Sequence, residues 1–277
     1  MLTLTIAAKS LPHKTCNRLK INEQWYDREI IISNMGRPYS LQVHKSTNTL
    51  FFSYSEPDTY TDTDFQLFDI NLATKEQHII AGIRGGCAVA IDQANDDIYL
   101  GGSDGIYKYN MLTKLADYYK EKGKNIWSLY YNRNLFYVSY PEQKLHIEID
   151  GKFMAVKEFG NFEVDLFHVT GNNEIYVFAN RTGLYTYDSN TFTVHILSEF
   201  LSVRQITEDN EGTIYICTNI GIFTYIYKSR DLIQIVDLKN VYGLAFDKDN
   251  QFVFSDEKNV VLLKHSEYGC ITNDNNW

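Results

Sequence analysis

Hydrophobic and polar positions along this chain recur as a repeated unit with the two-residue period of β-strands. Each unit has a short apolar run, a polar turn and then an aromatic-rich strand, as in PYSLQV followed by TLFFSYS. No long segment shows a helical period. Six units follow one another at spacings of 38 to 48 residues, and the shared apolar position of their first strands is occupied by Leu41, Val89, Leu129, Phe167, Ile206 and Leu244.

Further strands complete the unit. A third strand is visible as GIYKYN, GLYTYD or GIFTYI, and a fourth as FTVHILSEF or DLIQIVDL. Four short antiparallel strands every 40 or so residues are typical of a β-propeller blade. The sequence therefore predicts an all-β fold, a six-bladed β-propeller. The last unit lacks a fourth strand, and we expect QWYDREIIIS at residues 24–33 to pair with it and close the ring.

The domain organisation follows from this count. We expect one propeller over residues 24–270, an N-terminal segment 1–23 and a C-terminal tail 271–277. The first residues, MLTLTIAAKS, are apolar without a basic start, so they suit either a remnant of a signal peptide or a loose chain end.

Net charge and hydropathy limit the classes of partner that the chain is expected to bind. The net charge is −9 and no Lys/Arg block stands out, whereas nucleic-acid binding needs a basic face. No apolar run reaches the roughly 18 residues of a membrane helix. We therefore expect no nucleic-acid partner, no membrane partner, no cofactor and a monomeric chain.

The cysteines and one glycosylation sequon indicate which cellular compartment the chain would occupy. Ring closure brings the chain ends together, which predicts a disulfide between Cys16 and Cys270 and an oxidising compartment. Cys87 and Cys217 fall in different blades and are expected to be thiols. Asn180 begins an Asn-Arg-Thr glycosylation sequon in a predicted surface turn, usable if the chain is secreted.

One motif imitates a serine hydrolase. The run Gly101-Gly102-Ser103-Asp104-Gly105 matches G-x-S-x-G, but the nucleophile elbow joins a strand to a helix. Here it joins two strands, and its counterparts in two other repeats, ANRTG and CTNIG, have no serine at that place. We interpret it as a turn whose glycines supply conformational freedom.

A ring of residues stands two positions before each shared apolar position. Its members are Tyr39, Cys87, Trp127, Asp165, Arg204 and Tyr242. Six-bladed calcium-dependent lactonases and esterases hold their metal with acidic and amide oxygens at such positions. Only Asp165 suits that role and Arg204 is a cation, so the ring disfavours a calcium site, although a hydrolase of this class stays an alternative.

The same ring suits a flat aromatic ligand. Trp127, Tyr39 or Tyr242 could stack on it, and Arg204 or Arg37 could pair with a carboxylate. We expect this ring to surround one mouth of the central tunnel of the propeller, where Tyr140 and Asp165 add polar groups. The candidate ligand-binding residues are thus Arg37, Tyr39, Trp127, Tyr140, Asp165, Arg204 and Tyr242. The pattern alone leaves open whether they bind a ligand or only fill the tunnel.

The stretches NTLFFSYSE and AVAIDQANDDIYLGGSDGIYKYN, together with the chain length, resemble the insect ommochrome-binding proteins. The resemblance runs from about Trp25 through most of the chain and is strongest in the first two repeats. It implies a secreted haemolymph protein that binds and transports a planar, tryptophan-derived phenoxazinone pigment such as xanthommatin, without catalysis. A protein-interaction propeller is a further alternative, because one fold hosts many functions.

Overall fold

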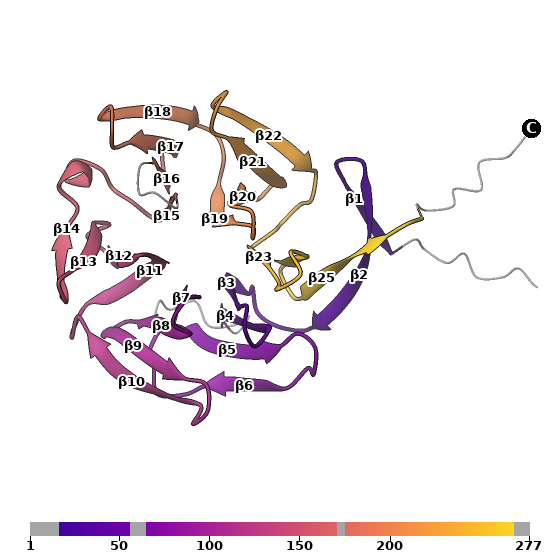
Figure 1. The fold of residues 1–277 in the computed structure, drawn as a ribbon, viewed down its shortest axis with the longest axis horizontal. Helices are drawn as coiled ribbons and strands as arrows, with labels where there is room; N and C mark the ends of the chain where they lie inside the picture. The colour runs from indigo at the N-terminus through magenta and orange to yellow at the C-terminus, as the bar shows by residue number, and fades with distance from the viewer. Residues whose placement is uncertain (1–16, 56–64, 171–174, 269–277) are drawn as a thin grey trace, which may run out of the picture.

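The computed structural model describes residues 17–55, 65–170 and 175–268. Within these ranges the chain forms six antiparallel sheets arranged in a ring (Figure 1). Both the all-β class and the six-bladed propeller are confirmed.

Each blade is one sheet, and the first five are built in chain order from the tunnel outward. The first blade contains β3 (Tyr39–His44), β4 (Thr49–Ser55), β5 (Phe65–Asn71) and β6 (Gln77–Ile80). The second contains β7 (Ala88–Asp92), β8 (Asp97–Gly102), β9 (Gly105–Asn110) and β10 (Leu115–Lys120). The third contains β11 (Asn125–Asn132), β12 (Asn134–Tyr140), β13 (Leu145–Ile149) and β14 (Lys152–Ala155). A 3₁₀ turn, η1 (Lys157–Phe159), follows the third blade. The fourth and fifth blades are formed by β15 (Leu166–Val169), β16 (Ile175–Asn180), β17 (Gly183–Asp188), β18 (Thr193–Ser198); and β19 (Val203–Glu208), β20 (Ile214–Thr218), β21 (Ile222–Ile226), β22 (Asp231–Val236).

The sixth blade contains both ends of the described chain. Its five strands run in the order β1 (Arg18–Ile21), β2 (Gln24–Ile32), β25 (Val260–Ser266), β24 (Phe252–Ser255) and β23 (Gly243–Phe246). β2 pairs antiparallel with β25 from Trp25–Ser266 to Ile32–Val260, which confirms the predicted ring closure (Figure 1). β1 adds an outer strand within the segment that we had assigned to the N-terminal extension.

The core lies between neighbouring blades. Phe52 on β4 and Val253 on β24 pack in one cluster that joins the first blade to the sixth, and each is fully buried. The second strand of each blade is nearly all buried, whereas outer strands such as β10 are mostly exposed. Apolar faces on both sides of the inner strands therefore hold the ring together.

The G-x-S-x-G run is a turn. It joins β8 to β9, and the Ser103 hydroxyl donates to the Arg84 carbonyl at 3.1 Å. Gly105 has φ +148°, and a Cβ there would lie 2.9 Å from the Lys120 carbonyl oxygen. The glycine is therefore required by the turn, and the turn interpretation is confirmed. No helix among the described residues is long and apolar enough to cross a membrane.

Candidate functional site

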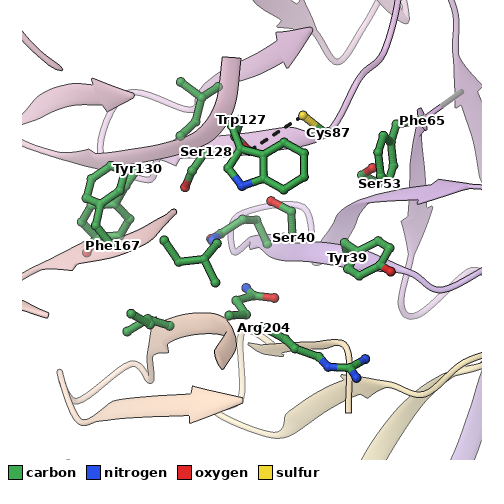
Figure 2. A pocket seen from close by; sticks show the side chains of 15 residues that line it. Tyr39, Ser40, Ser53, Phe65, Cys87, Trp127, Ser128, Tyr130, Phe167 and Arg204 are labelled. Carbon is green, nitrogen blue, oxygen red and sulfur yellow. Dashed lines mark hydrogen bonds between the residues drawn. The ribbon is translucent and has the colours of Figure 1, made fainter. Parts of the chain in front are cut away.

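A cavity of about 260 Å³ lies at the tunnel between the inner strands (Figure 2). Its wall is formed largely by β3, β11, β15 and β19, with additions from β4 and the start of β5. The lining is mixed, with apolar rings beside hydroxyl, amide and guanidinium groups. The aromatic members are Tyr39, Phe65, Trp127, Tyr130 and Phe167.

β-Bulges aim residues into this cavity from every second blade. The pairing of the first two strands shifts register between Tyr39 and Gln42, between Ile126 and Ser128, and between Val203 and Gln205. Ser40, Trp127 and Arg204 lie within these bulges, and all three line the cavity. Ser40 has φ 53°, an uncommon conformation for a residue other than glycine. Bulges re-aim side chains and concentrate next to functional sites.

The other three blades keep regular pairing at the same position. The amides of Cys87, Asp165 and Tyr242 donate to the carbonyls of Gly101, Ala179 and Ser255 at 2.9–3.1 Å. Of these three, only Cys87 lines the cavity. Bulged and regularly paired blades therefore alternate around the ring. The bulged first, third and fifth blades supply most of the residues that line the cavity.

The aromatic side chains form a continuous series of ring contacts. The Tyr39 ring centroid lies 5.3 Å from that of Tyr242 and 6.0 Å from that of Phe65. Phe65 lies 6.5 Å from Trp127, and Trp127 lies 5.5 Å from Tyr140. The Trp127–Tyr140 pair is tilted and the other three contacts are edge to face. Contacts of these kinds fix ring orientations, so the aromatic surfaces are preorganised.

Arg204 extends this series with a charge. Its guanidinium carbon lies 3.8 Å from the Tyr242 ring centroid, a cation–π contact, and Tyr242 itself is buried. Burial raises the pKa of the Tyr39 phenol above its ordinary value, while nearby Arg37 acts in the opposite direction. The mouth thus presents aromatic faces together with positive charge.

Gln205 connects three blades across the tunnel. Its Oε1 accepts hydrogen bonds from the amides of Leu41 and Leu244, each at 3.1 Å. Its Nε2 donates to the Leu41 carbonyl at 2.8 Å. The bulge in β3 removes Leu41 from the regular ladder, so the buried Gln205 side chain satisfies the groups that the bulge releases.

A polar cluster lies beside the inner part of the cavity. The Tyr130 hydroxyl donates to Glu208 Oε1 at 3.3 Å, and His168 Nε2 lies 3.2 Å from Glu208 Oε2. Burial raises the pKa of Tyr130 well above its ordinary value. Burial acts to raise the pKa of Glu208 as well, but hydrogen bonds from His168 and Tyr130 hold it below its ordinary value.

The predicted site residues fall into two groups. Tyr39, Trp127 and Arg204 line the cavity. The Tyr242 ring lies against the Arg204 guanidinium. The Tyr140 ring contacts Trp127, and 39 % of the Tyr140 surface is exposed. These five lie together, although Tyr39, Trp127 and Arg204 are separated along the chain by 88 and 77 residues.

The two remaining candidates lie beside the cavity and outside its wall. Arg37 interacts with the Tyr39 phenol. Asp165 accepts a hydrogen bond from the Gln143 side chain, and its burial raises the pKa of the carboxyl. Asp165 is therefore already engaged with a protein donor.

Sequence reasoning missed Phe65, Ser53 and Gln205. Phe65 ends an acidic insertion that lengthens the first repeat, YSEPDTYTDTDF at residues 54–65. Residues 56–64 of this insertion lie outside the described part of the chain. Ser53 does not stand out in the sequence, because it lies within the largely apolar strand TLFFSYS. Gln205 directly follows Arg204, and its position beside a ring residue was a signal that could have been used.

Metal and modification predictions have separate outcomes. In residues 17–55, 65–170 and 175–268, no three His, Cys, Asp or Glu side chains are grouped to hold a metal ion. Cys16 and Cys270 lie outside the described residues, so their disulfide stays a prediction. Cys87 and Cys217 are thiols. Asn180 ends β16, and its Oδ1 accepts hydrogen bonds from the Thr182 amide and hydroxyl.

No family model matches the sequence. The chain is 30% identical over 272 residues to the ommochrome-binding protein of Manduca sexta, an alignment that covers 95% of this chain and 97% of that protein. The chain belongs to the ommochrome-binding protein family. This membership confirms the resemblance carried by the first two repeats.

Solved structures share the fold of this family member. A gluconolactonase from Xanthomonas campestris superposes with a TM-score of 0.65 at 10% identity, covering 95% of this chain and 99% of that chain. Regucalcin from Agrobacterium tumefaciens, a calcium-binding protein, superposes with a TM-score of 0.64 at 11% identity, covering 87% and 94%. At such identities the likeness concerns the propeller fold alone.

Proposed function

We propose that this chain binds a planar aromatic pigment of the ommochrome class in the tunnel cavity and transports it without catalysis. The observation that carries the proposal is the joint delivery of Trp127 and Arg204 into one cavity by β-bulges. An indole face and a guanidinium suit a ligand that is a fused ring system with amino-acid carboxylates. The relative from Manduca sexta is named for binding such a pigment.

The roles follow from the geometry. The ring system would stack against Trp127 and the neighbouring faces of Tyr39 and Phe65. A ligand carboxylate would pair with Arg204, whose guanidinium is held in place by the Tyr242 ring. The exposed Tyr140 would cover the outer edge of the ligand. These contacts bind without a nucleophile or an acid–base pair, so we propose no enzymatic step.

The place of action is proposed from the same family. We propose a secreted monomer that carries pigment in haemolymph. The Asn180 sequon is compatible with this place of action, because Arg181 and Thr182 are exposed beside it and a secreted chain would present it for glycosylation.

A titration with xanthommatin tests the binding proposal. We expect the pigment's visible absorption to shift and to saturate near one equivalent of protein. Trp127→Ala and Arg204→Ala should each weaken binding about 10-fold or more, since each removes a stacking face or a charged hydrogen-bond partner. Arg181→Ala is the matched control, because Arg181 pairs with Glu163 outside the cavity. Absence of any shift at micromolar pigment would refute the proposal.

The alternative is a calcium-dependent lactonase or esterase. The experiment that separates it is calcium titration by calorimetry together with hydrolysis of a panel of lactones, with and without chelator. Chelator-sensitive turnover would establish the enzyme in place of the carrier.

A further inference from the structure

Ser53 occupies a position on the second strand of the blade that other blades use for an interblade hydrogen bond. The equivalent residue of the fifth blade is Cys217, whose thiol donates to the Val241 carbonyl at 3.3 Å. In the sixth blade it is Ser255, whose hydroxyl donates to the Pro38 carbonyl at 2.7 Å. Each acceptor directly precedes a ring residue of the next blade. Blades two, three and four have Gly101, Val138 and Ala179 there, which lack a side-chain donor.

Ser53 departs from this scheme. By analogy its acceptor would be the carbonyl of Gly86, which precedes the ring residue Cys87. Instead the Ser53 hydroxyl is buried, with no hydrogen-bond partner among the described residues. Ser53 lines the cavity beside Phe65 (Figure 2). A buried hydroxyl without a partner costs free energy, and a bound molecule that accepts its hydrogen bond would recover that cost.

The surroundings define what Ser53 contacts. Its cross-strand partner is Tyr39, which contacts Phe65 edge to face. A ligand atom that meets Ser53 therefore lies level with these rings, where a fused ring system would stack. The ligand's carboxylates are attracted elsewhere, to the guanidinium of Arg204. The partner of Ser53 is thus a neutral polar atom within the ring system.

We propose that the Ser53 hydroxyl donates a hydrogen bond to a ring carbonyl oxygen of the bound ligand and so selects oxidised, carbonyl-bearing ring systems. This inference rests on the proposed function, since it assigns a further specificity residue to the same cavity. A buried hydroxyl that a ligand leaves unpaired costs free energy, so it discriminates against a ligand without a matching polar atom.

Two ring compounds isolate this contact. Calorimetric titration compares phenoxazin-3-one, which carries the ring carbonyl, with phenoxazine, which has the same three-ring skeleton without it. Wild-type protein should prefer phenoxazin-3-one, and Ser53→Ala should lower affinity for it about 3- to 10-fold while leaving phenoxazine binding unchanged. Equal affinities in wild type and Ser53→Ala, an equal loss for both compounds, or no binding of either to wild type would overturn the inference.

Ser255→Ala is the matched control. It removes a satisfied interblade bond, so its midpoint of thermal unfolding should fall by about 2–4 °C while the preference for the carbonyl compound persists. Ser53→Ala should not lower the midpoint. A fall equal to that of Ser255→Ala would assign Ser53 to the interblade bond and overturn the inference. If wild type ignores xanthommatin yet keeps a Ser53-dependent carbonyl preference, the proposed function fails while this inference stands.

Discussion

Gln205 offers a direct test of how the tunnel is held. Replacement by Ala removes three hydrogen bonds, to the Leu41 amide, the Leu41 carbonyl and the Leu244 amide. Each buried backbone group that loses its partner costs about 1–3 kcal/mol. Water that enters the enlarged cavity restores part of this loss. We therefore expect Gln205→Ala to lower the free energy of unfolding by about 3 kcal/mol.

The assay compares two glutamines by urea denaturation. Gln93 makes the same kind of bridge, since its Nε2 donates to the Val43 carbonyl at 2.7 Å and its Oε1 accepts from the Lys45 amide at 3.0 Å. Gln93 is exposed, so water replaces those bonds when it is removed. Gln93→Ala should therefore cost less than about 1 kcal/mol. Equal costs for the two variants would refute the reasoning that burial sets the value of the Gln205 bridge.

A third variant separates donor from acceptor. Gln205→Glu keeps an oxygen for the two amides but turns a second oxygen toward the Leu41 carbonyl. Protonation of the carboxyl restores a donor there, so the destabilisation should ease as the pH falls toward 5. A destabilisation that is the same at pH 5 and pH 8 would contradict this account.

Three further predictions concern titration, thiol reactivity and modification. Burial lowers the pKa of Lys45 to about 8, so the folded chain binds fewer protons than the unfolded chain between about pH 8 and 10.4. Wild type should therefore gain stability relative to Lys45→Met as pH rises through that window, and parallel unfolding curves would contradict this. Iodoacetamide should modify Cys87, which lines the cavity, before the fully buried Cys217, and saturating xanthommatin should slow it; an unchanged rate would place the pigment elsewhere. Expression through a secretory pathway should add a glycan at Asn180 that Thr182→Ala removes, and an unmodified mass would show that this sequon is unused.

The fold could be predicted from the sequence because each blade repeats the same local signals. Apolar strands such as TLFFSYS and polar turns recur six times, and every repeat reinforces the same interpretation. The closing strand was also accessible, because the last unit visibly lacked one. β1 was not, since RLKI is too short to stand out from the segment that surrounds it.

The site was only partly predictable. Counting two positions back from the shared apolar residue found Trp127 and Arg204, because ring positions follow the repeat. It could not reveal the bulges that turn these residues into the cavity, since one extra residue leaves little trace in an alternating pattern. Nor could it show that Arg204 and Tyr242 lie against each other. Ser53 escaped because its significance is a missing hydrogen bond, which a sequence does not display.

The closure of the ring constrains the order in which the blades can be completed during synthesis. The Gln24 side chain donates to the Ser266 carbonyl, 242 residues further along the chain. At ordinary translation rates β2 is made roughly 10–50 s before its partner β25. During that interval the apolar faces of the first blades are available and the ring stays open. One edge of β2 can pair with β1 at once, but its other edge stays unpaired until β25 has been made, so the sixth blade is the last to be completed.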